Sequence, residues 1–201
     1  MNKLMIRPLF LGTLLAAAVG VQAEGSVPHP SLRFMMTAGI TGGGDKIDEI
    51  QFKNGGSTNV TGGGRASIGA GVQWQPEDTP VIVQATVNYH FSGVFADNGS
   101  ANFSRIPVEL MAFYKLNDQW RVGGGVRYVF APSYSYDVDG DYNYDVDFKN
   151  TVGGVVEVGY AFTPNVVVGL RYVKEEYELK NFKSSKKFDG SHVGLTGSYI
   201  F

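Results

Sequence analysis

The chain has 201 residues with 17 basic and 19 acidic side chains, a formal net charge of −2, and no cysteine. This mild acidity argues against nucleic acid as a partner, and the lack of cysteine excludes disulfides, thiolate metal sites and a cysteine-linked lipid anchor. The mature part has no run of 18 apolar residues, so helices that span a membrane are excluded as well.

The first 23 residues predict a secretory signal peptide that is cleaved from the mature protein. Lys3 and Arg7 give a positive amino end, an apolar run covers residues 9–21, and Ala23 ends a small-residue cleavage site. The apolar run is shorter than the roughly 20 residues that a spanning helix needs. We therefore expect one mature domain over residues 24–201, with 15 basic and 19 acidic residues and a net charge of −4.

Eight later segments alternate between apolar residues and small or polar ones, as strands do between lipid and a barrel interior. In the last segment, Leu195 and Tyr199 fall on the opposite side from Thr196. An open sheet edge cannot face lipid, so the pattern predicts an all-β fold, an eight-stranded antiparallel up-and-down transmembrane barrel. The segments are residues 32–40, 65–74, 81–90, 105–114, 120–130, 155–162, 166–173 and 192–201.

The connections between these segments alternate strictly between long and short, starting with a long one. Short turns belong at the periplasmic end of such a barrel and long loops lie outside, so both termini are expected in the periplasm. Pro107 lies inside the fourth segment and cannot donate to a strand ladder, so we expect a bulge there or a later strand start. The short connections are residues 76–80, 116–119 and 163–165, and the long ones are about 42–64, 92–103, 132–149 and 174–190.

Aromatic residues fall at both ends of the outward faces, where the two headgroup layers of a bilayer are expected. The periplasmic set is Trp74, Tyr114, Trp120, Tyr160, Phe162, Tyr199 and Phe201, and the outer set is Tyr89, Tyr128, Phe130 and Tyr172.

The inward faces carry a set of charges that must pair or meet water, because burying an isolated ion is costly. Eight strands enclose a space that side chains just fill. We therefore expect Glu109 and Glu157 to be held by several arginines in a polar plug that joins the strands. The alternative is that the arginines line a narrow channel for small solutes. The expected set is Arg33, Arg65, Arg105, Glu109, Arg121, Arg127, Glu157 and Arg171.

The strand pattern, the stretch from Arg105 to Glu109 and the ending Tyr199-Ile200-Phe201 resemble the small eight-stranded outer-membrane barrels of the OmpA-transmembrane-domain and OmpX kind. The resemblance covers residues 31–201. It implies a Gram-negative outer membrane, with Tyr199 and Phe201 in the assembly signal. It also implies outer-membrane lipid, lipopolysaccharide and the assembly machinery as partners of a protein that we expect to be monomeric. Members of this architecture include structural proteins, adhesins, narrow channels and lipid-modifying enzymes.

His90-Phe91-Ser92 is similar to the His-x-Ser pair of outer-membrane lipid A deacylases, with Glu109 as a candidate orienting carboxylate. Gly93 follows where that family carries asparagine, and the alternation turns His90 and Ser92 inward, away from lipid. The sequence therefore predicts no enzyme, and a hydrolase using these residues is the third hypothesis after a structural or surface-interaction role and a channel.

Two long connections carry opposite charge patterns. Asp137, Asp139 and Asp141 in the third are weak candidates for a divalent cation, since hard cations prefer clustered carboxylates. Gly140 does not fall at the sixth position of an EF-hand loop, so that motif is excluded, and no cofactor is expected. The lysines of the fourth connection have two predicted roles. They either form ion pairs with the acidic residues of the third connection or contact the phosphates of lipopolysaccharide. These lysines are Lys174, Lys180, Lys183, Lys186 and Lys187.

Overall fold

The computed structural model describes residues 31–51, 57–96, 99–138, 142–180 and 187–201. Within these ranges, no helix is long and apolar enough to cross a membrane. Residues 1–23 lie outside them, so cleavage of a signal peptide stays a prediction. The strands are β1 Ser31–Gly43, β2 Lys46–Gln51, β3 Ser57–Thr61, β4 Ala66–Gln75, β5 Val81–Ala96, β6 Gly99–Lys115, β7 Trp120–Val138, β8 Tyr142–Asp147, β9 Thr151–Ala161, β10 Val166–Lys174, β11 Glu176–Glu178, β12 Lys187–Asp189 and β13 His192–Ile200.

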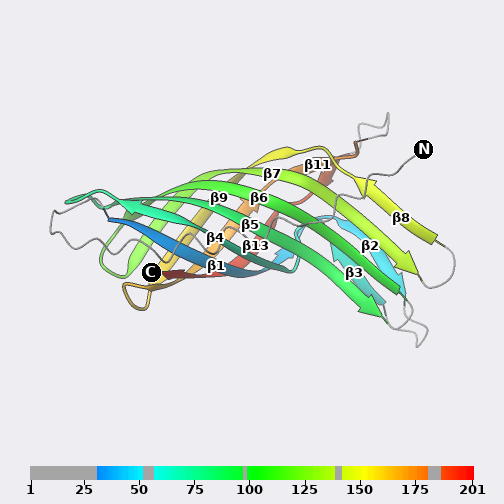
Figure 1. Cartoon of the computed structure of the whole chain (residues 1–201), viewed down its shortest axis with the longest axis horizontal. Coiled ribbons are helices and arrows are strands. Elements are labelled where there is room, and N and C mark those ends of the chain that lie inside the picture. The colour runs from blue at the N-terminus through cyan, green and yellow to red at the C-terminus, as the bar shows by residue number, and fades with distance from the viewer. Residues whose placement is uncertain (1–30, 52–56, 97–98, 139–141, 181–186) are drawn as a thin grey trace, which may run out of the picture.

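Eight of these strands close into an antiparallel barrel, which confirms the predicted fold (Figure 1). The hydrogen-bonded order is β6-β5-β4-β1-β13-β10-β9-β7, and β6 pairs with β7 to complete the ring. The first and last strands pair with each other, as Ala38 opposite Gly197 shows. Closure gives every spanning strand two hydrogen-bonded neighbours, which is the condition for a sheet in lipid.

The outward faces are apolar and exposed, as the alternation predicts. Leu170 on β10 lies opposite Leu195 on β13 and Val158 on β9, and the three side chains are exposed. The inward residues between them are small or polar, such as Thr196. A continuous apolar wall of this kind matches a hydrocarbon solvent and no aqueous one.

The strands extend further than the predicted 9–11 residues at one end of the barrel. β5 has 16 residues and β6 has 17, so most of the expected loop over 92–103 is a continuous hairpin. β7 continues to Val138 and pairs there with β8, while β2–β3 and β11–β12 form two further hairpins. We call this the hairpin end, and the opposite end, with connections 76–80, 116–119 and 162–165, the short-turn end (Figure 1).

Pro107 lies within β6 rather than before it, so the expected later strand start is wrong. Pro107 is in register with Val129, but the pairing of β6 with β7 shifts between Ser104 and Ile106. The extra residue belongs to β7, where Ala131 has a positive φ of 44°. A bulge therefore forms close to Pro107 as predicted, but on the neighbouring strand.

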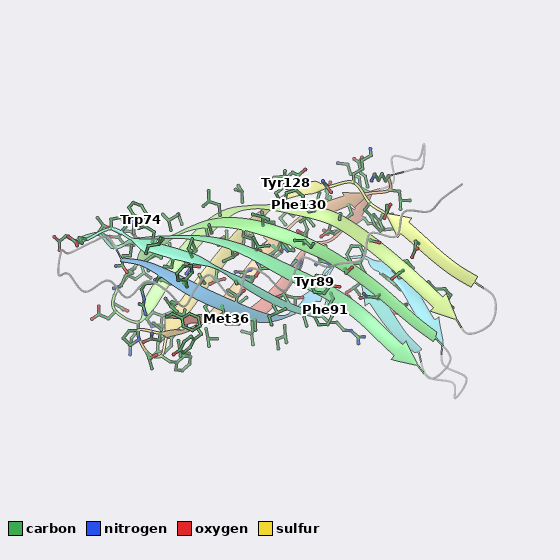
Figure 2. All side chains as sticks on the ribbon, viewed as in Figure 1. Met36, Trp74, Tyr89, Phe91, Tyr128 and Phe130 are labelled. Carbon is green, nitrogen blue, oxygen red and sulfur yellow. The ribbon has the colours of Figure 1, made fainter. Side chains whose placement is uncertain are left out.

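Aromatic side chains lie at both ends of the outer wall. Figure 2 shows Trp74 near the short-turn end, and Tyr89, Tyr128 and Phe130 further towards the hairpin end. The rings of Tyr128 and Phe130 are in contact with centroids 4.5 Å apart, and those of Tyr199 and Phe201 are 5.0 Å apart. Their exposure on the outer wall fits the two interfacial bands expected from the sequence.

Replacing Leu170 with arginine is expected to lower the free energy of unfolding by about 2–4 kcal/mol, because it places a charge midway along a lipid-facing strand. The matched change Val166→Arg, at the short-turn end of the same strand, is expected to cost only about 0–1 kcal/mol. Denaturant titrations in lipid vesicles, followed by tryptophan fluorescence, give both values. Equal losses would contradict this placement of β10 across the bilayer.

Candidate functional site

Arg171 on β10 joins the two predicted carboxylates in the middle of the barrel interior. Its Nη2 donates to Glu157 Oε2 at 2.7 Å and its Nη1 to Glu109 Oε2 at 3.0 Å. Glu157 is the cross-strand partner of Arg171 on β9, whereas Glu109 lies on β6. A Cβ at Gly169 would lie 2.6 Å from Glu157 Oε1, so glycine at this position leaves room for the carboxylate.

The interior charges lie at three heights along the barrel. Arg121 on β7 lies nearer the short-turn end than Arg171 does. Its guanidinium lies over the ring of Phe113, 4.3 Å from the centroid, and Nη2 is 3.8 Å from Glu157 Oε1. Nη1 donates to Gln73 Oε1 at 3.5 Å. The aromatic face and the carboxylate together stabilise a cation that is almost fully buried.

Glu175 is the central residue of the layer nearer the hairpin end, and the sequence analysis did not select it. Its Oε2 lies 3.3 Å from Arg127 Nε, and its Oε1 lies 3.6 Å from Arg105 Nε. Arg127 also approaches Glu109, at 3.5 Å. Glu175 follows β10 in a segment that the sequence predicts as a loop, but the inward alternation of Val173 continues through it to Tyr177. Extending the alternation beyond the membrane would have found it.

Arg33 and Arg65 do not belong with these charges, which corrects their predicted place. Arg33 donates to the carbonyl oxygens of Phe201 and Ile200, at 2.8 and 3.2 Å, at the short-turn end. Arg65 is exposed at the hairpin end, where its Nη2 donates to the Asn59 carbonyl at 3.4 Å. Strand parity places a residue inward or outward, but at the rim of a barrel an inward position can open to solvent.

An aromatic cluster covers the charges at the hairpin end. The rings of Phe103, Phe148 and Tyr177 meet edge to face, with Phe103 5.5 Å from each of the other two. The guanidinium of Arg105 lies 5.2 Å from the Phe103 centroid and 5.7 Å from that of Tyr177, and all three residues are fully or almost fully buried. Val60, Ala101, Val129 and Tyr134 complete the cluster.

Tyr177 connects this aromatic cluster to the charges below it. Its hydroxyl donates to Glu175 Oε1 at 2.5 Å, and burial raises the pKa of the phenol well above its usual range. None of the three guanidinium nitrogens of Arg105 has a hydrogen-bond partner among the described residues. Arg105 is therefore held by the charge of Glu175 and by two ring faces.

His90 and Ser92 face the interior and are nearly fully buried. His90 Nε2 is hydrogen bonded to Thr41 Oγ1 at 2.8 Å, and its ring meets that of His192 with centroids 5.2 Å apart. Ser92 Oγ has no hydrogen-bond partner among the described residues, and Glu109 is bound by arginines. His90, Ser92 and Glu109 therefore do not form the hydrogen bonds of a hydrolytic triad in this structure.

The aspartates considered for a cation lie largely outside the described part of the chain. Asp139 and Asp141 fall outside it, and only the backbone of Asp137 is described, at the end of β7. The remaining described residues contain no group of three or more His, Asp or Glu side chains that could hold a metal ion.

A cleft of about 440 Å³ lies on the outer wall at the hairpin end, and we call it the outer-wall cleft. Two exposed ion pairs border it, Lys149 Nζ with Glu178 Oε2 at 2.8 Å and Lys187 Nζ with Glu176 Oε2 at 3.0 Å. The hydrogen bond from Lys149 lowers the pKa of Glu178, and the bond to Glu176 raises that of Lys187. Its lining is Lys149, Asn150, Thr151, Val152, Lys174, Glu175, Glu176, Glu178 and Lys187.

These features define an integral barrel of the outer-membrane class: a closed antiparallel ring, an apolar outer wall with aromatic bands, and a charged interior. The chain matches the family model of the outer membrane protein beta-barrel domain over residues 9–201, and it belongs to this family.

Solved structures with a similar fold include two bacterial proteins. Ail, the attachment invasion locus protein of Yersinia pestis, was solved in complex with the heparin analogue sucrose octasulfate; it is 10% identical, with a TM-score of 0.54, over 85% of this chain and 97% of its own. Neisserial surface protein A is 13% identical, with a TM-score of 0.52, over the same shares of each chain. At these identities the likeness concerns the fold. No curated protein matches the sequence.

Replacing Glu175 with alanine is expected to lower the free energy of unfolding by about 3–5 kcal/mol, because it leaves Arg105 buried without a carboxylate. Glu178→Ala, three residues along, removes only an exposed ion pair and should leave the unfolding midpoint nearly unchanged. Denaturant titrations of both refolded proteins measure the difference. Similar midpoints for the two variants would show that Glu175 does not stabilise the interior.

Proposed function

We propose that this protein is a closed, monomeric barrel of the Gram-negative outer membrane with a structural or surface-interaction role carried by its outer hairpins. The observation that supports a closed barrel most directly is the filled hairpin end. There Arg105, Glu175 and Tyr177 are buried beneath Phe103 and Phe148. Water or a solute would have to displace these side chains to pass.

A small cavity lies in the middle of the barrel. A cavity of about 20 Å³ lies between the side chains of Glu109, Glu157, Arg171 and their neighbours. That volume holds about one water molecule. The interior charges are therefore close enough to stabilise one another. We expect the function at the outer surface and not inside the barrel.

A narrow channel for small solutes is the second candidate, and the interior charge favours it. Four arginines, at positions 105, 121, 127 and 171, face three carboxylates, at positions 109, 157 and 175. This excess of one positive charge would attract small anions. Conduction would require the side chains of Glu175 and Tyr177 to leave the hairpin end.

In planar lipid bilayers, the wild-type barrel is expected to produce no stepwise conductance, because the aromatic cluster blocks the hairpin end. The double variant Phe103→Ala/Tyr177→Ala removes two rings of this cluster and should conduct small ions. Tyr172→Ala, which truncates an aromatic on the lipid-facing side, is the matched control and should stay silent. Regular conductance steps from the wild type would overturn the closed barrel in favour of the channel.

The proposed role includes no hydrolysis of lipid A. His90 is engaged by Thr41 inside the barrel, and both His90 and Ser92 are shielded from the lipid face. Mass spectrometry of lipid A from cells that express the wild type is expected to give the same acyl pattern as from cells that express His90→Ala. Loss of an acyl chain that depends on His90 would instead make this protein an enzyme.

A further inference from the structure

The outer-wall cleft begins where the lipid-facing band ends. Lys174 is the next outward residue of β10 after Tyr172, and Val152, which lines the cleft, is 66% exposed and pairs with Tyr128. Asn150 Nδ2 donates to Tyr128 Oη at 3.4 Å. Tyrosines of this kind settle at the level of lipid headgroups. The lysines of the cleft are thus at the height where the headgroups of the outer leaflet lie.

The cleft carries a net positive charge on its open side. Lys149, Lys174 and Lys187 contribute three positive charges, and Glu176 and Glu178 contribute two negative ones. Glu175 also lines the cleft, but its carboxylate turns inward to Arg105 and Arg127. The exposed groups that line the cleft therefore sum to +1, and Asp189, whose charge interacts with that of Lys174, is not among them.

The three lysines differ in how they are held. Glu178 and Glu176 fix the amines of Lys149 and Lys187 through hydrogen bonds of 2.8 and 3.0 Å. Lys174 forms no ion pair within 4 Å among the described residues, although it lies close enough to Asp189 for the two charges to interact. Two positioned ammonium groups beside a third that forms no ion pair suit an anion with several oxygens.

The size and the lining of the cleft restrict that anion further. A volume of about 440 Å³ is within the range of small-ligand sites and exceeds what a bare inorganic ion fills. Val152 offers an apolar contact in the lining, and Asn150 and Thr151 offer polar groups. A phosphorylated sugar joined to an acyl chain matches all three features.

We propose that the outer-wall cleft binds a phosphate group of lipopolysaccharide in the outer leaflet, with Lys174 as the main contact and Lys149 and Lys187 beside it. This inference rests on the outer-membrane location in the proposed function and is independent of whether the barrel conducts.

The test uses the full mature chain, refolded in detergent, and purified lipopolysaccharide, with binding followed by native mass spectrometry across a titration. Lys174→Ala breaks no ion pair and is expected to weaken binding several-fold. The triple variant Lys149→Ala/Lys174→Ala/Lys187→Ala is expected to weaken it about tenfold or more, as the loss of three surface cations near a membrane implies. Lys180→Ala is the matched control, since this exposed lysine belongs to the same segment but does not line the cleft.

Three further probes distinguish the source of the phosphate. Dephosphorylated lipopolysaccharide should bind the wild type as weakly as intact lipopolysaccharide binds the triple variant. Phosphatidylglycerol and inorganic phosphate should bind more weakly than lipopolysaccharide, because neither supplies a phosphorylated sugar. Equal affinity for phosphatidylglycerol would replace lipopolysaccharide by anionic lipids in general and overturn the proposal.

The proposal is also overturned if the wild type and the triple variant bind lipopolysaccharide equally, or if Lys180→Ala weakens binding as much as Lys174→Ala. Heat-dependent migration in gels establishes that each variant is folded before it is titrated. Conductance of the same samples keeps the two proposals apart. If the wild type conducts but still binds lipopolysaccharide more tightly than the triple variant does, only the closed barrel is rejected. If the wild type does not conduct and binds lipopolysaccharide no more tightly than the triple variant, only the cleft proposal is rejected.

Discussion

Backbone hydrogen bonding in a solvent that offers no partners is the constraint on which the rest of this structure depends. Lipid cannot satisfy an unpaired N–H or C=O group, so the sheet has to close on itself. Closure is completed by the pairing of β1 with β13, strands that lie at opposite ends of the described chain. A ring of eight strands is narrow, and the space that it encloses is just wide enough for side chains to fill.

The narrow interior determines how the charges of the barrel are arranged. Each buried arginine needs a carboxylate or an aromatic face, because the desolvation of an isolated cation is costly. Arg171 uses Glu109 and Glu157 to connect strands that are not neighbours, and Arg121 uses Phe113. At the hairpin end the connection after β10 supplies Glu175, so a residue from outside the spanning strands completes the interior.

The strands at the hairpin end continue the alternation of the barrel beyond its apolar wall, and this changes what the outward positions carry. Along β10 the outward residues are apolar up to Tyr172, and beyond it they are Lys174, Glu176 and Glu178. The inward positions stay buried, and they carry Val173, Glu175 and Tyr177. The same two-residue alternation along β10 and β11 thus contributes Tyr177 to the aromatic cluster and Lys174, Glu176 and Glu178 to the outer-wall cleft.

The sequence by itself determined the fold, the inward or outward direction of each spanning residue and the order of short and long connections. These properties follow from a period of two residues, which is local and readable without tertiary contacts. Only the tertiary structure decided which charges meet. Arg33 and Arg65 share the inward parity of Arg171 but lie at the rims, whereas Glu175, in a predicted loop, lies beside Arg105. Such pairings depend on closure and on height along the barrel, which bring together residues far apart in the chain.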